Sequence, residues 1–389
     1  MNSGRYVLSQ ILDLVHWQTL NRLAAKHAPG SRCRHLGFRQ QFICMVFAQL
    51  TWREGLRDIV ECLNARRETL YHLGFSSPVA RSTLAEANEQ RDWRIWEALA
   101  QGLIRKARPL YAGEDLGLDL DNTVYALDST TIDLSLTLFP WADFRSTKAG
   151  IKLHTQLDLR GPIPSCILVT AAREHDVGWL DGLLFEPGAF YVLDRGYMDF
   201  ARLARIADAA ASFVTRAKSN LRFSRQFSMP VDRSTGLRSD QVGRPTLPGA
   251  RRDFPHMLRR VRYFDETSGR CFVFLTNNLT IPALSVALLY KSRWQVELFF
   301  KWVKGHLRVK HYYGNSANAV RTQIWIAVCT YVMIAILHKQ LGLPGTLHRT
   351  LQLLSVHPFA KVPLAELLME TDSGNPTNPN PNQLSLWDL

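Results

Sequence analysis

Polar side chains that could act on phosphate recur at helical spacing between positions 290 and 304. They are Tyr290, Arg293, Glu297, Lys301 and Lys304. At 100° per residue they occupy a stripe about 80° wide on one helix face. Such a helix would present one carboxylate beside three cations and a phenol, and cations of this kind bind phosphate oxygens. An amphipathic helix with i,i+4 surface charge pairs has the same pattern, so the stripe alone leaves both interpretations open.

Two more carboxylates follow short apolar runs that are typical of strands. Asp128 comes directly after residues 124–127, and Asp194 comes directly after residues 190–193. A carboxylate at the end of an apolar strand is a poor packing residue and a good hard-oxygen ligand for Mg²⁺. Two ions about 4 Å apart can activate water or a 3′-hydroxyl for in-line attack at phosphorus. Asp128, Asp194 and Glu297 are therefore candidate catalytic, metal-binding residues.

The elements that must position these acids change character along the chain. Residues 1–115 have apolar side chains at helical spacing, which predicts a helical domain. From about residue 120, β-prone runs at 124–128, 151–157 and 166–169 precede a helix, a strand at 190–194, another helix and a strand at 212–215. Helical patterns resume near residue 282 and run towards 340. This order predicts a mixed α/β core behind an N-terminal all-helical domain.

A basic segment separates the second Asp from the Glu. Residues 214–262 contain 12 Lys and Arg but only 3 Asp, a net charge of +9. Gly, Pro and Ser are scattered among short β-like runs, which predicts a β-rich insertion. Because acidic partners are almost absent, we expect Arg216, Lys218, Arg222 and Arg225 to bind DNA.

Composition and charge narrow the class of protein. The chain has 389 residues, 46% of them hydrophobic and 21% charged, which excludes global disorder. A net charge of +13 indicates a polyanionic partner such as nucleic acid. The N-terminus has no secretion signal, and the apolar run 324–337 is short for a bilayer span, which predicts a core helix in a soluble, intracellular protein. Six cysteines without a C-x-x-C pair indicate reduced thiols.

The motifs together resemble the bacterial DDE transposases of the insertion-sequence-four family. That family's signature is an Asp ending the first core strand, then D-x-G-[YF], then Y-x2-R-x3-E-x6-K. The matching segments here are Asp128-Ser129-Thr130-Thr131, Asp194-Arg195-Gly196-Tyr197, and the series Tyr290, Arg293, Glu297 and Lys304 with every spacer intact. The resemblance covers roughly residues 120–340.

The resemblance implies a ribonuclease-H-like mixed-sheet core with a β-rich insertion. It implies that Asp128, Asp194 and Glu297 hold two Mg²⁺ ions, which Mn²⁺ can replace. Tyr290, Arg293 and Lys304 would grip the transposon-end phosphates, with Lys301 and Trp294 as further candidates. Trp294 could stack on an unpaired base or pack in the core. The implied activity is cleavage of double-stranded transposon ends, in many members through a hairpin, and their joining to target DNA. A homodimer in the synaptic complex and a bacterial cytoplasmic, nucleoid-associated location are also implied.

Residues near the expected site have local interpretations. His175-Asp176 could orient a phosphate or water, but we expect Asp176 to cap the N-terminus of a helix. His154, on an alternating strand, is expected to be structural or at the surface. Lys152 could touch DNA near Asp128, and the sequence does not decide this.

The C-terminal peptide suggests a further partner. Gln383, Leu384, Leu386 and Trp387 form an apolar, Gln-led segment after a polar Pro/Asn-rich stretch. Such a segment resembles the short motif by which bacterial proteins dock on the replication sliding clamp. Folding back of this tail onto its own domain remains the alternative.

These observations divide the chain into five parts. They are an N-terminal helical, DNA-binding domain at 1–115, the first part of the core at 116–210, the basic insertion at 211–281, the second part of the core at 282–360, and a flexible tail at 361–389. Two other functions remain open: an inactive protein that only binds transposon ends, and a ribonuclease-H-like nuclease without strand transfer. Three intact carboxylates argue against the first, because acids near phosphate weaken binding.

Overall fold

The computed structural model describes residues 4–30, 33, 35–114, 116–118, 120–145, 148–306 and 312–369. These residues form two compact units. One unit holds the described residues of 1–112, 132–151 and 300–369, and the other holds those of 113–131 and 152–299. The units cut across the five parts expected from the sequence, and that division stays a prediction.

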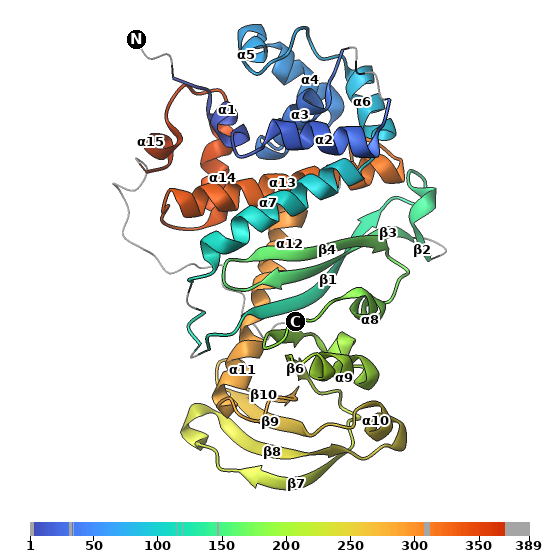
Figure 1. The fold of residues 1–389 in the computed structure, drawn as a ribbon, viewed down its shortest axis with the longest axis vertical. Helices are drawn as coiled ribbons and strands as arrows, with labels where there is room; N and C mark the ends of the chain where they lie inside the picture. The colour runs from blue at the N-terminus through green and yellow to red at the C-terminus, as the bar shows by residue number, and fades with distance from the viewer. Residues whose placement is uncertain are drawn as a thin grey trace. The chain divides into compact units, whose positions relative to one another are not determined.

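The first unit is mainly helical, and its centre is one long apolar helix. This helix, α13 (Ala317–Gln340), contacts α3, α6, α7 and α14 (Figure 1). By length and composition it could cross a membrane, with a mean hydropathy of 1.7, but 94% of its apolar window is buried. Helices on several sides cover it, so the predicted core helix at 324–337 is confirmed. The other helices of this unit are α1 (Val7–Leu12), α2 (Trp17–His27), α3 (Phe38–Leu50), α4 (Leu56–Asn64), α5 (Arg67–His72), α6 (Arg81–Gln90), α7 (Arg94–Tyr111), α14 (Leu347–Val356) and α15 (Leu364–Met369).

The second unit is built on a mixed sheet in the strand order β4-β3-β1-β5-β6-β10-β9-β8-β7. The parallel strands β1, β5 and β6 form its centre, with Val124 paired to Phe190 and Phe190 paired to Ser212. The remaining pairs from β6 to β7 are antiparallel. The strands are β1 (Val124–Leu134), β3 (Lys148–Asp158), β4 (Ile163–Ala171), β5 (Phe190–Leu193), β6 (Ser212–Arg216), β7 (Phe223–Met229), β8 (Leu237–Pro245), β9 (Leu258–Asp265) and β10 (Arg270–Thr276).

The parts of β1 and β3 beyond Thr131 and before Lys152 belong to the first unit, where β2 (Asp143–Arg145) pairs with the start of β3. The basic segment forms the strands expected of it. These strands extend the core sheet, because β10 pairs with β6. The predicted mixed α/β fold with an N-terminal helical region is confirmed.

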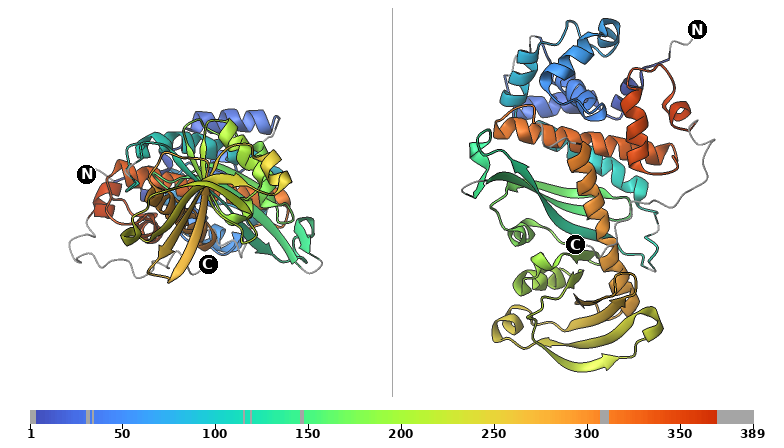
Figure 2. Two further views of the ribbon diagram at one scale, coloured as in Figure 1. Left: turned by 90° about the horizontal axis from the view of Figure 1, so that it is seen from below. Right: turned by 180° about the vertical axis from the view of Figure 1, so that it is seen from behind.

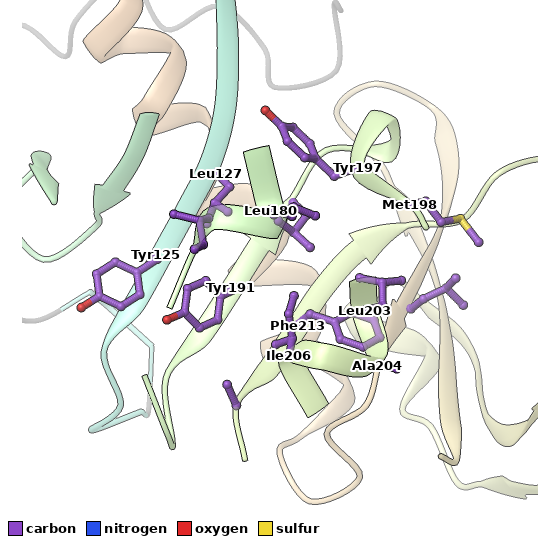
Figure 3. Packing of buried hydrophobic residues seen from close by; sticks show 14 of the residues in the cluster. Tyr125, Leu127, Leu180, Tyr191, Tyr197, Met198, Leu203, Ala204, Ile206 and Phe213 are labelled. Carbon is purple, nitrogen blue, oxygen red and sulfur yellow. The ribbon is translucent and has the colours of Figure 1, made fainter. Parts of the chain in front are cut away.

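The two faces of this sheet carry different helices. On one face, Tyr125 and Leu127 of β1 and Tyr191 of β5 pack with Leu180 and Leu203 (Figure 3). These last two residues come from the 3₁₀ helix η2 (Leu180–Gly182) and from α9 (Phe200–Asp208). The same face carries α8 (Asp176–Trp179), and α10 (Pro248–Asp253) packs against α9.

Helix α11 (Ala283–Ser292) contacts β5, β6, β9 and β10, and α12 (Trp294–His306) follows it directly along the chain (Figure 2). Side chains alternate along a strand, so Asp128 and Asp194 point away from the face that carries Leu127 and Leu193. On that side Asp194 accepts a hydrogen bond from Tyr290 of α11, and Asp128 pairs with Arg293 at the junction of α11 and α12.

Candidate active site

Two neighbouring parallel strands bring Asp128 and Asp194 together. The paired residues of β1 and β5 end at Leu127 and Leu193, so each Asp comes one residue after the last pair. This is the carboxyl edge of the parallel strands, where functional groups gather in open α/β sheets. Asp128 does not end its strand as expected, since β1 continues to Leu134 and only the pairing with β5 stops there. Asp194 begins the 3₁₀ helix η3 (Arg195–Tyr197) without capping it through its side chain.

The third acid comes from the helical segment that crosses the other face of the sheet. The expected single helix is divided at Arg293, whose backbone N–H bonds to the carbonyl of Tyr290 at 3.2 Å, three residues back. Helical backbone angles are kept at Arg293, so Arg293 and Glu297 remain one turn apart on one face. Val296, Phe299 and Val303 are buried on other sides of α12, which holds that face in place.

One guanidinium group joins two of the three carboxylates. Nη1 of Arg293 donates to Oδ2 of Asp128 at 2.7 Å, and Nη2 donates to Oε1 of Glu297 at 2.6 Å. The side chains of Arg293 and Asp128 are 12% and 18% exposed, so solvent screens their ion pair weakly. The hydroxyl of Tyr290 donates to Oδ1 of Asp194 at 3.3 Å. The expected residues Asp128, Asp194, Tyr290, Arg293 and Glu297 therefore lie in one network of the second unit.

Burial governs the protonation of this network. Desolvation raises the pKa of Asp128 from 3.8 to about 7, against the opposing effect of the Arg293 charge, while Asp194 and Glu297 add to the increase. Burial likewise raises the pKa of Tyr290 to about 12, which keeps its hydroxyl protonated as a donor. Burial works to lower the pKa of Arg293, but the carboxylate of Asp128 and the other nearby anions raise it overall. Arg293 is thus held as a cation.

The chemistry of the donor set fits divalent metal. Asp128, Asp194 and Glu297 offer the carboxylate oxygens that Mg²⁺ prefers, and the Arg293 guanidinium stands in as a cation between two of them. Among the described residues, no three His, Cys, Asp or Glu side chains lie close enough together to share an ion. Binding of an ion by this set therefore requires Arg293 to move away from the carboxylates.

Other residues expected to contact DNA lie outside this network. Lys301 and Lys304 are exposed further along α12, in the part of the helix that belongs to the first unit, and Trp294 is half-buried. Arg216 ends β6 with its guanidinium 4.9 Å from the ring centre of Phe272. Three exposed basic side chains lie on β7 or just before it: Lys218, Arg222 and Arg225. Gln383, Leu384, Leu386 and Trp387 lie outside the described residues.

A polar cluster beside Asp128 was not expected from the sequence. Asp176 does not cap α8: its Oδ1 accepts from the Ser129 hydroxyl at 2.6 Å and pairs with Nζ of Lys152 at 3.0 Å. The backbone N–H of Ser129 donates to Oδ1 of Asp128 at 2.8 Å, which links the cluster to the site. His154 is buried beside it, and burial lowers its pKa to about 4. The sequence placed Asp176 and Lys152 near the expected site, but it did not predict their contacts with each other or with Ser129.

Comparison with known proteins shows a family match and several similar transposases. Residues 119–333 match the family described as "Transposase DDE domain", and residues 3–76 match a domain of unknown function (DUF4372). A putative transposase, y4zB, of Sinorhizobium fredii is 36% identical over 54% of this chain and 59% of its own length. A probable transposase for insertion sequence element IS5377 of Geobacillus stearothermophilus is 31% identical over 55% of this chain and 56% of its own. A putative transposase for insertion sequence element IS4SA of Synechocystis is 23% identical over 73% of this chain and 76% of its own.

The chain thus spans less than two thirds of the length of the first two relatives. The matched segment 119–333 contains both strands that bear Asp residues and the helices that carry Tyr290, Arg293 and Glu297. Its sheet, in the order β4-β3-β1-β5-β6 with parallel central strands, is that of a ribonuclease-H-like core. The chain belongs to the family of transposase DDE domains.

Proposed function

We propose that this chain is a transposase that binds transposon ends, cleaves them by metal-dependent chemistry at phosphorus and joins them to target DNA. The observation that carries the proposal is the meeting of Asp128, Asp194 and Glu297 around Arg293 and Tyr290, at the carboxyl edge of β1 and β5. Arg293 pairs with two of these acids, and Tyr290, whose ring lies beside the guanidinium, donates a hydrogen bond to the third.

The residues divide the work by their chemistry. Asp128, Asp194 and Glu297 would hold two Mg²⁺ ions, with Mn²⁺ as a substitute. Ions bound there supply activation of the attacking water or 3′-hydroxyl and stabilisation of the leaving oxygen. Arg293 would hold a phosphate oxygen next to the scissile bond through its paired N–H groups. Tyr290 stays protonated and donates a hydrogen bond.

Basic residues outside the network would hold the rest of the DNA. Lys301 and Lys304 continue the face of Glu297 along α12 by helical periodicity, and Trp294 is a candidate for stacking on an unpaired base. Arg216, Lys218, Arg222 and Arg225 lie on or next to β6 and β7 and would contact the duplex backbone. Excision through a hairpin intermediate belongs to this proposal as one route.

Two partners complete the proposal. Two transposon ends must be brought together, so the active form would be a homodimer acting in the bacterial cytoplasm. The C-terminal peptide with Gln383, Leu384, Leu386 and Trp387 would dock on the replication sliding clamp. Deleting residues 383–389 should abolish clamp binding, and unchanged binding would contradict this docking.

Duplex DNA carrying the inverted repeats that flank the gene tests the function. With Mg²⁺ we expect cleavage at the repeat ends followed by joined products, and with EDTA we expect neither. Asp128→Asn should abolish cleavage and spare DNA binding. Binding without cleavage would favour the inactive end-binding protein, and cleavage without joining would favour the nuclease.

A further inference from the structure

In the protein without DNA, Arg293 is hydrogen-bonded to two carboxylates. Both terminal nitrogens of its guanidinium are directed at acids, Nη1 at Asp128 and Nη2 at Glu297. Its Nε is buried and has no hydrogen-bond partner in the described part of the chain. The guanidinium carbon lies 5.6 Å from the ring centre of Tyr290, which covers it from another side. Each terminal nitrogen of Arg293 therefore already donates to a carboxylate before any ligand binds.

The two roles proposed for this site compete for the same atoms. A phosphate that binds both terminal nitrogens of Arg293 competes with Asp128 and Glu297 for them. A divalent ion held by Asp128 and Glu297 must replace Arg293 at Oδ2 and Oε1. The competition is strong because Arg293 and Asp128 are shielded from solvent, so charges placed there are screened little.

We propose that Arg293 closes the metal site in the DNA-free protein, and that a DNA phosphate opens it by drawing the guanidinium away from Asp128 and Glu297. The inference rests on the proposed function, because it assigns the regulation of the same site. DNA and metal then bind with positive coupling, and the coupling must be reciprocal. Arg293 lies at the junction of α11 and α12, and the exchange would be made by a change of its long side chain.

The proposed exchange of Arg293 for a metal ion is tested by the Mn²⁺ affinity of the full chain without DNA. The affinity is measured from the electron paramagnetic resonance of free Mn²⁺. Arg293→Gln removes the competing charge, so we expect about tenfold tighter Mn²⁺ binding than in the wild type. Lys291→Gln makes the same charge change on an exposed side chain of the same helix and should leave the affinity unchanged. Equal or weaker Mn²⁺ binding by Arg293→Gln would overturn the proposal.

Two further variants keep the test decisive. If Arg293→Gln does not fold, Arg293→Lys is measured in its place. One ammonium group cannot bridge both acids, so we expect the Arg293→Lys variant to bind Mn²⁺ about threefold tighter than the wild type. No gain in that variant would equally overturn the exchange. Asp128→Asn should remove the measured Mn²⁺ site. If it does not, the ions bind elsewhere and the proposed function itself fails, whereas a lost site without any gain from Arg293→Gln defeats the exchange alone.

The reciprocal arm adds duplex DNA carrying the inverted repeat. We expect the wild type to gain Mn²⁺ affinity when the duplex is present, and Arg293→Gln to gain much less because its site is already open. An equal gain in both proteins would show that DNA acts on the metal by some route other than Arg293.

Discussion

Asp128 should make the stability of the protein depend on pH in a range where exposed acids do not. Its pKa rises from 3.8 to about 7 because burial disfavours the carboxylate more than Arg293 favours it. A difference of about 3 pH units at about 1.4 kcal/mol per unit corresponds to about 4 kcal/mol. Because the folded pKa lies above the unfolded one, this stabilisation is complete below about pH 4 and is lost as pH rises through about 7.

Urea unfolding of the wild type and Asp128→Asn, in EDTA at pH 5, 6, 7 and 8, measures this contribution. An amide does not titrate, so the wild type should lose about 3 kcal/mol relative to Asp128→Asn between pH 5 and pH 8. Asp133→Asn removes an exposed carboxylate from the same strand and provides the matched control, which should follow the wild type at every pH.

A gap between the wild type and Asp128→Asn that stays constant from pH 5 to pH 8 would refute this reasoning. It would mean that the ion pair with Arg293 lowers the pKa of Asp128 at least as much as burial raises it. A pKa of Asp128 held at or below its ordinary value would give this constant gap, because the carboxyl group is then ionised in both the folded and the unfolded state from pH 5 to pH 8.

Three more predictions concern other residues of the second unit. Arg259→Ala leaves the Asp240 carboxylate, 3% exposed and paired at 2.7 Å, without its partner, so urea unfolding should show a loss of about 3–5 kcal/mol. Arg225→Gln, on the exposed edge strand β7, should lower the slope of log affinity against log salt by about 1 in fluorescence anisotropy with duplex DNA, and an unchanged slope would remove Arg225 from the interface. Asp176→Ala releases Ser129 next to Asp128 and should slow single-turnover cleavage by about 10–100-fold, with Asp176→Asn recovering part of the rate; full activity in Asp176→Ala would make the cluster irrelevant to the reaction.

Sequence patterns predicted most of the core elements, because each is fixed by local periodicity. The alternating run at 151–157 is part of β3, and the apolar run at 190–193 is β5. The extent of β1 could not be predicted, because β1 also pairs with the long strand β3 and continues to Leu134 after its pairing with β5 stops. In the same way, the basic segment predicted strands, but only the pairing of β10 with β6 shows that they extend the core sheet.

The sequence named the five residues that meet at Arg293, but it predicted only part of their contacts. Helical spacing places Arg293 beside Glu297, and the structure has that contact at 2.6 Å. The contact of Arg293 with Asp128 joins residues 165 positions apart, and no local pattern encodes it. For the same reason Asp176 was expected to cap its own helix, whereas its carboxylate reaches Ser129, 47 positions away. Burial, which sets the pKa of Asp128, likewise follows from the assembled fold.

Local cleavage of the polypeptide by bound Fe²⁺ tests the central claim most directly. With Fe²⁺ in place of Mg²⁺, and ascorbate and peroxide added, hydroxyl radicals cut the backbone next to the metal ligands. In the presence of inverted-repeat duplex we predict cuts near residues 128, 194 and 297, all suppressed by excess Mg²⁺ and by Asp128→Asn. Mg²⁺-sensitive cuts elsewhere, with none near these three positions, would contradict a shared metal site built from Asp128, Asp194 and Glu297.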